Sequence, residues 1–259
     1  PAGGDESVDR CMRTDENNMT DSQQNNSTTA PVVACQGVQR IYQQDTVPVY
    51  ALRGADLTIN AGEFVSLAGP SGSGKSTLLN VIGGLDGFDA GSVVVGGVDL
   101  GGLNAAELAE MRLRNVGFVF QAYNLIPVLT ARENVEFILQ LQGTPSQERR
   151  DRANIALQRL GLGDLGDRRP GELSGGQQQR VAIARAIVTE PVLLLADEPT
   201  ANLDSKTTEE LLGLLRDLNQ QQGMTLVTAT HDPIVMSYTP RHAAILDGEM
   251  RHERASAGD

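Results

Sequence analysis

Positions 69–77 read Gly69-Pro70-Ser71-Gly72-Ser73-Gly74-Lys75-Ser76-Thr77, and apolar runs stand on both sides, at 64–68 and 78–82. This is the phosphate-binding pattern G-x-x-x-x-G-K-[ST], set between a strand and a helix. Its glycines allow backbone N–H groups to turn inward around a phosphate at the helix N-terminus. Lys75 adds a positive charge for the β- and γ-phosphates, and Ser76 offers a hydroxyl to Mg²⁺. Because every position of the pattern is filled, we expect a nucleoside-triphosphate site here and not merely a glycine-rich turn.

The composition limits which partners are expected. The chain has 259 residues, with Lys+Arg 21 against Asp+Glu 33 and a net charge of −12, which argues against a nucleic-acid partner. The charge does not exclude ATP, because the loop supplies a local positive potential. The two cysteines lack metal-ligand spacing and are interpreted as reduced thiols in the cytosol. No apolar run reaches the roughly 18 residues of a membrane span, and no signal peptide is recognised, so we expect any action at a membrane to need a partner.

Polar composition predicts a disordered tail at 1–31 and a second tail at 255–259, with a folded domain at 32–254 between them. Alternating apolar residues predict strands at 32–42 and 49–59. Tyr42 falls at the end of the first strand, where an aromatic ring could stack on a base or pack at a sheet edge. The spacing does not distinguish these alternatives.

The middle of the chain changes from strands to helices. A hairpin at 92–100 and a helix at 105–114 precede an apolar strand that ends at Gln121, an amide that could contact a ligand or face solvent. Thr130 and Glu133 form a capping-box pattern, and helices follow to 160. These helices interrupt the strands, which predicts an inserted helical lobe at about 125–188.

Further along, a helix start offers a second anion-binding surface. Ser174 stands at the N-cap position, and Gly175 and Gly176 expose N–H groups at the positive end of the following helix. Taken alone, the pattern fits an ordinary capped helix equally well.

Two carboxylates follow the apolar strand at 192–196. Ligands bind at the carboxyl ends of strands in open α/β sheets, so Asp197 is placed to hold Mg²⁺ and Glu198 to orient or deprotonate a water. A solvated acidic loop is a weak alternative after so apolar a run. His231 follows a strand at 225–229 and could contact a γ-phosphate, although a single His is more often a structural residue.

With the segment 173–180, the motifs and their order closely resemble the nucleotide-binding subunit of ATP-binding-cassette (ABC) transporters, over about 32–250. The resemblance implies an α/β P-loop NTPase fold: an ABC-type nucleotide-binding domain with an antiparallel β subdomain and an inserted helical subdomain. The segment at 173–180 is the part that kinases and GTPases lack.

The resemblance also implies roles for individual residues. Nucleotide binding would use Tyr42 on adenine, 69–77 as the Walker A loop, Ser174, Gly175, Gly176 and Gln177 as the signature, and Asp204 across a dimer interface. Catalysis would use Glu198, the switch histidine His231 and the Q-loop glutamine Gln121, and Mg²⁺ would be held by Ser76, Gln121 and Asp197. The implied cofactors are ATP and Mg²⁺.

In that family two subunits sandwich two ATP molecules head to tail, and hydrolysis drives an integral membrane permease subunit. The resemblance therefore implies an ATP-dependent homodimer at the cytoplasmic face of the inner (plasma) membrane, without a nucleic-acid partner. A soluble ABC ATPase acting on DNA or ribosomes is disfavoured by the single cassette and the acidic charge.

Segments 83–86, 117–127 and 129–135 are similar to the lipoprotein-release and macrolide-export branch (LolD/MacB/FtsE-like) of the family. This predicts a separate-subunit motor for export, lipoprotein release or mechanotransmission. The alternative is a regulatory ATPase module that controls a cell-wall or division complex through its membrane partner without transporting a substrate. Ala201 departs from the glycine common at its position, and we expect little effect.

Overall fold

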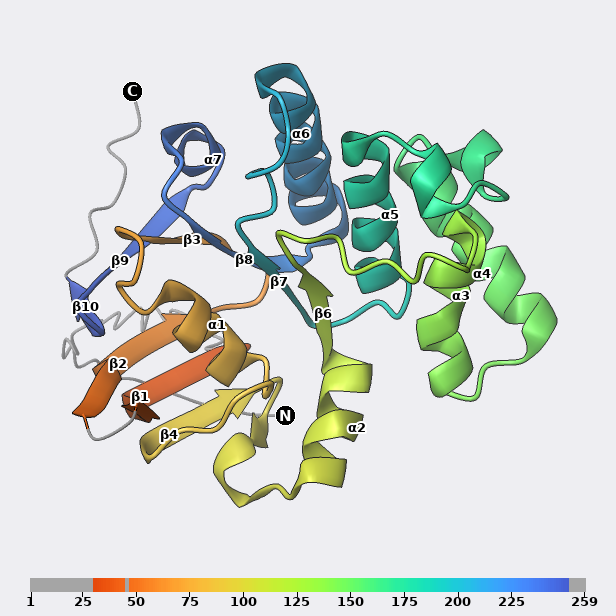
Figure 1. Cartoon of the computed structure of the whole chain (residues 1–259). Coiled ribbons are helices and arrows are strands. Elements are labelled where there is room, and N and C mark those ends of the chain that lie inside the picture. The colour runs from red at the N-terminus through yellow and green to blue at the C-terminus, as the bar shows by residue number, and fades with distance from the viewer. Residues whose placement is uncertain (1–29, 45–46, 252–259) are drawn as a thin grey trace, which may run out of the picture.

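The computed structural model describes residues 30–44 and 47–251, so almost all of the expected tail at 1–31, and all of that at 255–259, lie outside it (Figure 1). The described strands form two sheets. The first is antiparallel in the order β2-β1-β4-β5, and the second has the order β10-β9-β3-β8-β7-β6. The strands of the first sheet are β1 Val33–Gln44, β2 Val47–Ile59, β4 Ala90–Val95 and β5 Val98–Asp99. Those of the second are β3 Phe64–Ala68, β6 Val116–Val119, β7 Leu193–Asp197, β8 Thr225–Thr230, β9 Arg241–Leu246 and β10 Glu249–Arg251.

The second sheet is parallel from β9 to β6, and only the β9–β10 pair is antiparallel. Its central strands are covered on both faces, which explains why they read as continuous apolar runs. In β7, Leu194 and Ala196 face a core shared with the helices, whereas Leu193 and Leu195 face a core shared with the antiparallel sheet. Helix α1 (Lys75–Ile82) lies between the two sheets (Figure 1). Its buried apolar residues belong to the core shared with the antiparallel sheet.

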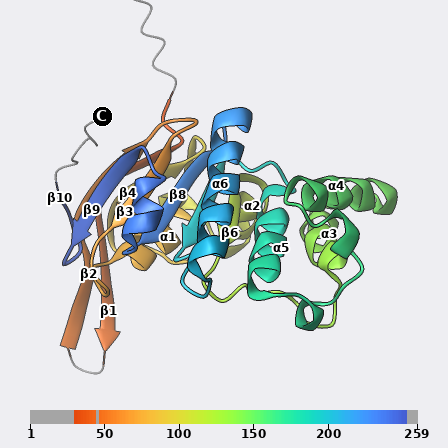
Figure 2. The same ribbon diagram turned by 90° about the horizontal axis from the view of Figure 1, so that it is seen from above.

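The remaining helices cover the other face and one end of the molecule. Figure 2 shows α3 (Ala131–Leu141) and α4 (Ser146–Arg159) at the end opposite the β1–β2 hairpin, with α5 (Gly175–Ile187) and α6 (Ser205–Gln222) between them and the strands. Helix α2 (Ala105–Asn115) precedes β6, and the short α7 (Pro233–Ser237) precedes β9. The expected helices and strands are present. Helix α4 begins directly after Pro145, and the 3₁₀ turns Gly163–Leu165 and Pro170–Glu172 lie between α4 and α5.

A buried amide fixes the segment between β6 and α3. The Asn134 side chain is fully buried; it accepts a hydrogen bond from Ile126 N at 2.8 Å and donates to the carbonyls of Ile126, Leu129 and Thr130. Leaving these groups unpaired inside the fold would be costly. The loop that begins at Gln121 is therefore held to α3. The limits of the helical lobe, about 125 and 188, stay a prediction.

Candidate nucleotide-binding site

The loop between β3 and α1 is packed tightly against two carbonyl groups. A Cβ on Gly69 would lie 2.2 Å from the Ile245 carbonyl oxygen, and one on Gly74 would lie 2.7 Å from that of Ala51. Gly74 also has a φ of 106°, which side chains rarely adopt. Both positions therefore require glycine. The pattern at 69–77 folds as expected, into a loop whose end is the N-terminus of α1.

Lys75 folds back over this loop. Its side chain is only 6 % exposed, and Nζ donates to the carbonyl oxygens of Gly69 at 2.8 Å and Pro70 at 2.9 Å. An ammonium group has three donors, so one remains for a phosphate oxygen. The Ser73 hydroxyl is buried in the same loop without a partner among the described residues. Both features suit an anion-binding cradle.

Ser76 and Asp197, the two residues expected to hold Mg²⁺ from opposite sides, meet in the structure. Ser76 Oγ donates to Asp197 Oδ1 at 3.0 Å, which joins the start of α1 to the end of β7. In the described part of the chain no group of three or more His, Cys, Asp or Glu could hold a metal. A hydroxyl and one carboxylate nonetheless fit Mg²⁺, which keeps several waters and takes further oxygen ligands from phosphates.

Burial raises the pKa of the Asp197 carboxyl above its ordinary value. The hydrogen bond from Ser76 opposes this shift, the nearby Glu198 adds to it, and Lys75 opposes it again. The charged form of Asp197 is therefore disfavoured in the nucleotide-free fold. A bound cation would reverse that preference.

Glu198 and His231 form the third contact of the site. Glu198 has a left-handed backbone, with φ 45°, and its N–H donates to the Ala229 carbonyl at 3.0 Å. This conformation places Glu198 Oε1 2.7 Å from His231 Nδ1. The imidazole is 67 % exposed and the carboxylate 17 %. The histidine thus orients a carboxylate that is otherwise largely enclosed.

A cavity of about 390 Å³ gathers these residues at the carboxyl ends of the parallel strands. Its walls include six predicted loop residues together with Gln121, Glu198 and His231. It is also lined by residues that the sequence analysis did not assign to the site: Val49, Tyr50, Ala51 and Ala201. Tyr50 is about half exposed here. Tyr50 pairs with Ile41 across the sheet, beside an irregularity in the β1–β2 register. The spacing of residues in the sequence does not reveal this pairing.

Two further residues fix the loop of Gln121. Asn202 Nδ2 donates to the Gln121 carbonyl at 3.0 Å, and Arg185 donates to the carbonyls of Tyr123, at 3.0 Å, and Asn124. Burial lowers the pKa of Arg185. Neither Asn202 nor Arg185 was predicted as a site residue. Gln121 itself is exposed at the cavity, so its predicted metal contact stays a prediction.

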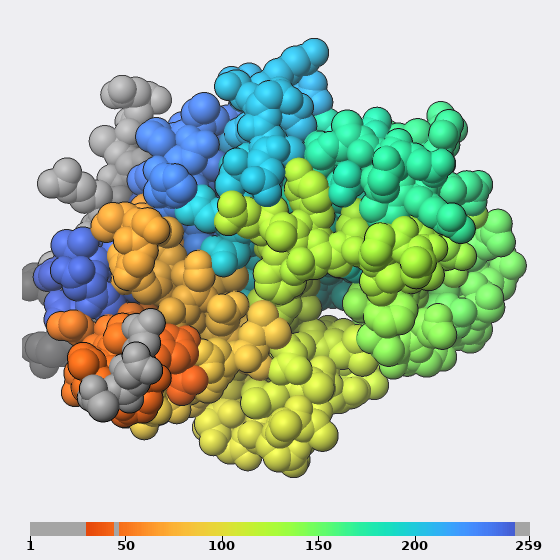
Figure 3. All heavy atoms as spheres, viewed as in Figure 1, coloured from red at the N-terminus to blue at the C-terminus, as the bar shows by residue number. Residues whose placement is uncertain are grey.

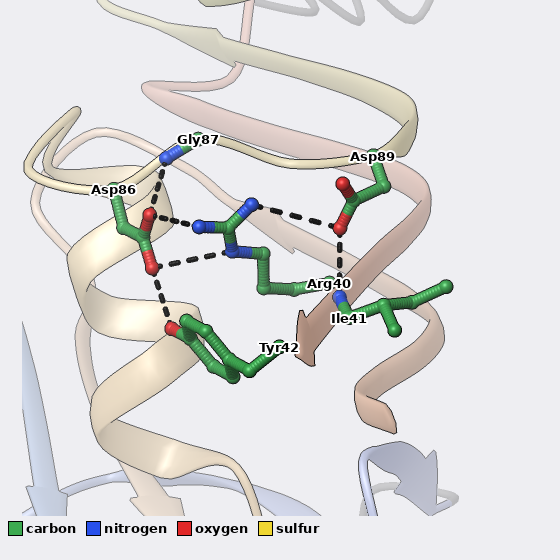
Figure 4. A network of polar contacts seen from close by, with 6 residues as sticks. All are labelled: Arg40, Ile41, Tyr42, Asp86, Gly87 and Asp89. Carbon is green, nitrogen blue, oxygen red and sulfur yellow. Dashed lines mark hydrogen bonds and ion pairs between the residues drawn. The ribbon is translucent and has the colours of Figure 1, made fainter. Parts of the chain in front are cut away.

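The predicted adenine residue, Tyr42, does not line this cavity. Its ring is 36 % exposed, and its hydroxyl donates to Asp86 Oδ2 at 2.5 Å (Figure 4). The phenol thus has a polar partner within the chain, and β1 is an inner strand of its sheet. Stacking on a base stays a prediction.

The signature residues are not brought to the loop of 69–77 within one chain. Ser174 caps α5 in a full capping box: its Oγ accepts from Gln177 N at 3.3 Å, and its N–H donates to Gln177 Oε1 at 2.9 Å. None of the four signature residues lines the cavity. Asp204 caps α6, and hydrogen bonds from Thr207 hold the pKa of its carboxyl below its usual range.

Comparison with known proteins identifies the family. The family model described as "ABC transporter" matches residues 52–201. The chain belongs to the ABC transporter family. An uncharacterised ABC transporter ATP-binding protein of Thermotoga maritima is 52 % identical over 195 residues, 75 % of this chain and 83 % of the relative.

Other relatives differ in length or have known structures. The macrolide export ATP-binding/permease protein MacB of Marinobacter nauticus is 48 % identical over 220 residues, 85 % of this chain but 34 % of the relative. The chain thus spans about a third of that protein's length. A relative in Methanocaldococcus jannaschii is the uncharacterised ABC transporter ATP-binding protein MJ0796. A dimeric structure of the ABC cassette MJ0796 superimposes on this chain with a TM-score of 0.81 at 44 % identity. The match covers 88 % of this chain and 100 % of the other. The ABC fold expected from the sequence is confirmed.

The raised pKa of Asp197 predicts that one substitution stabilises the nucleotide-free chain but removes its stabilisation by ATP with Mg²⁺. A carboxyl whose folded pKa lies above its unfolded pKa destabilises the fold at neutral pH, and this penalty disappears as the pH falls through the folded pKa. Asp197→Asn should therefore raise the melting temperature of the nucleotide-free chain at pH 7.5, and the difference should shrink at lower pH. The same variant should lose the stabilisation that wild type gains from ATP with Mg²⁺.

Thermal unfolding from pH 5 to 8, with and without ATP and Mg²⁺, measures both effects. Asp217→Asn, at an exposed position of α6, is the control and should behave as wild type. Equal stabilisation of Asp197→Asn and wild type by ATP with Mg²⁺ would contradict the metal assignment.

Proposed function

We propose that this chain is the ATP-binding and ATP-hydrolysing subunit of an ABC transporter complex. One observation carries the proposal. The Ser76–Asp197 hydrogen bond, the Lys75 ammonium and the Glu198–His231 pair converge beside the same glycine-rich loop. These are the groups needed to hold a triphosphate and to direct a water at it. The family match and the relatives named as ATP-binding proteins support it.

The proposed reaction is attack of water on the γ-phosphorus of ATP. The loop N–H groups and Lys75 hold the β- and γ-phosphates, and Glu198 orients the water and accepts its proton as the bond to the β–γ bridging oxygen breaks. ADP and phosphate result. His231 holds Glu198 in place and lines the same cavity, where it would contact the γ-phosphate. Mg²⁺ bound by Ser76, Asp197 and Gln121 would neutralise charge on the phosphate oxygens.

We propose further that two chains assemble head to tail. The chain has two anion-binding helix starts, at α1 and at α5, and the second lines no part of the first one's cavity. A site would be complete if the Ser174–Gln177 segment of one chain covered the phosphates held by the other. Asp204, exposed at the start of α6, would cross that interface. The solved relative is dimeric and is bound to ADP and Pi.

The membrane partner is proposed to dock on a second, mostly apolar cavity. This cavity, of about 400 Å³, lies between α2, β6, α3 and α5, and its wall includes Leu85, Phe118, Phe120 and Ile138. Figure 3 shows the surface hollowed between α2 and α3. No helix in the described part of the chain could cross a membrane. We place the chain at the cytoplasmic face of the inner membrane, below a permease-type subunit of the lipoprotein-release or macrolide-export kind, a relationship supported by the MacB relatives.

Glu198→Gln should abolish turnover and retain ATP binding. Removing a general base lowers rates by about 10²- to 10⁴-fold, while the phosphate contacts are untouched. Phosphate release and equilibrium ATP binding measure the two effects, and Glu209→Gln at an exposed position of α6 serves as control. Full turnover in Glu198→Gln would refute the proposed mechanism.

Mixing two inactive variants tests the head-to-tail assembly. Lys75→Ala disables the loop of 69–77, whereas Ser174→Asp keeps a good N-cap and repels the γ-phosphate. Each variant alone should be inactive. An equimolar mixture should recover part of the wild-type ATPase rate, because a mixed dimer contains one site with an intact loop and an intact signature. A mixture as inactive as its components would favour sites completed within one chain.

Photo-crosslinking tests the docking cavity. A photoreactive amino acid at Leu85, on the cavity rim and 45 % exposed, should form an adduct with an integral membrane protein in membranes of the native host. The same group at Ile155, exposed on α4 outside this cavity, is the control and should not. Equal adducts at both positions, or only with soluble proteins, would contradict the assigned surface.

A further inference from the structure

Tyr42 is held by a network that the proposed reaction does not use. Its hydroxyl donates to Asp86 Oδ2 at 2.5 Å, and the same carboxylate accepts from Arg40 Nη2 at 2.7 Å and Nε at 3.3 Å (Figure 4). The Gly87 N–H donates to Asp86 Oδ1 at 2.8 Å. Asp86 therefore accepts four hydrogen bonds, and an Arg–carboxylate pair with two contacts fixes orientation as well as distance.

Arg40 also touches the ring directly. Arg40 and Tyr42 are two residues apart on β1, so their side chains leave the strand on the same side. The Arg40 guanidinium carbon lies 4.8 Å from the Tyr42 ring centroid. The tyrosine is thus fixed at two places, the hydroxyl by Asp86 and one ring face by Arg40. Tyr42 is 36 % exposed, so part of its ring stays accessible to a flat ligand.

A second carboxylate completes the frame without touching the tyrosine. Asp89 Oδ2 accepts from Ile41 N at 2.7 Å and lies 3.6 Å from Arg40 Nη1. Asp86 and Asp89 both belong to the segment that joins α1 to β4. The network therefore ties β1 to the end of the helix that begins at the phosphate-binding loop.

The tyrosine remains a hydrogen-bond donor at neutral pH. Burial and the bond to Asp86 raise the pKa of Tyr42, whereas hydrogen bonds with Arg40 and Thr77 oppose the shift. Thr77, which interacts with the Tyr42 hydroxyl, lines the phosphate cavity, although Tyr42 itself does not. The network therefore adjoins the proposed triphosphate site.

We propose that Asp86 and Arg40 are positioning residues for nucleotide binding, which hold Tyr42 with one ring face free to stack on the base. This rests on the proposed ATP site and on the predicted stacking of Tyr42 on adenine. The network contributes to binding of the base and not to binding of the phosphates, because neither Asp86 nor Asp89 lines the loop cavity. A free tyrosine would have to be ordered when ATP binds, and pre-ordering it removes that cost.

The test compares two ligands in the Glu198→Gln background, so that ATP is not consumed. Calorimetry measures Kd for ATP and for inorganic tripolyphosphate, which lacks the base, both with Mg²⁺. Tyr42→Ala should weaken ATP by about ten- to a hundred-fold, the usual range for a base–aromatic stack, and leave tripolyphosphate unchanged. Tyr42→Phe, which keeps the ring and loses the bond to Asp86, should weaken ATP several-fold, as should Asp86→Ala.

A double-mutant cycle separates positioning from general support. Asp86→Ala should add nothing once Tyr42 is Ala, and Asp86→Asn, which keeps one acceptor, should recover part of the affinity. Asp89→Ala removes the other carboxylate that contacts Arg40, one without a contact to Tyr42. This variant is the matched control and should have the smaller effect on the affinity for ATP.

The outcomes distinguish the two levels of the proposal. If Tyr42→Ala does not change ATP affinity, the stacking role itself is wrong. If Tyr42→Ala weakens ATP but Asp86→Ala and Tyr42→Phe do not, Tyr42 stacks without a positioning network. Equal loss of ATP and tripolyphosphate binding in Asp86→Ala, or additive effects in the cycle, would assign Asp86 a structural role and overturn the inference. Should Asp86→Ala fail to fold, Tyr42→Phe against wild type decides the same question.

Discussion

The register of β3, β8 and β7 is the constraint on which the site depends. Ala68 pairs with Thr230, and Ala229 pairs with both Leu67 and Asp197, so the three parallel strands end at one level. The loop of 69–77, the Asp197–Glu198 pair and His231 follow directly from those ends. A slip of one residue in either pairing would turn alternate side chains to the opposite face and separate Ser76 from Asp197. Both cores enforce the register, because β7 packs against one on each face.

The order of motifs and the apolar strands made this arrangement predictable. A glycine-rich loop after one buried strand and two carboxylates after another must meet if both strands are parallel members of one sheet, as Ser76 and Asp197 do. The signature helix was predictable for a similar local reason: its cap and its two glycines are adjacent in sequence. Such local patterns carry their own physical reason, so the sequence alone predicts their geometry.

Contacts between distant segments were not predictable in this way. Tyr42 could be assigned either a base or a sheet edge, because nothing in its spacing reveals that Asp86, 44 residues away, accepts its hydrogen bond. Asn202 reaches Gln121 across 81 residues, and Arg185 reaches Tyr123 across 62. Ala51 illustrates the same limit: its place against Gly74 follows from an irregular β1–β2 register that alternation alone does not show.

One segment connects the phosphate cavity to the apolar cavity. Phe118 and Phe120 stack with centroids 5.5 Å apart and line the apolar cavity, while the next residue, Gln121, lines the other. The backbone after Gln121 cannot move alone, because Arg185 and Asn134 bind its carbonyls from helices α5 and α3. A partner that displaces Phe118 and Phe120 would therefore displace Gln121, which is joined to Phe120 by one peptide bond. It would also displace helices α3 and α5, which are hydrogen-bonded to the loop. A packed connection of this kind moves between discrete arrangements more readily than it bends, which suits the proposed ATPase subunit of a membrane complex.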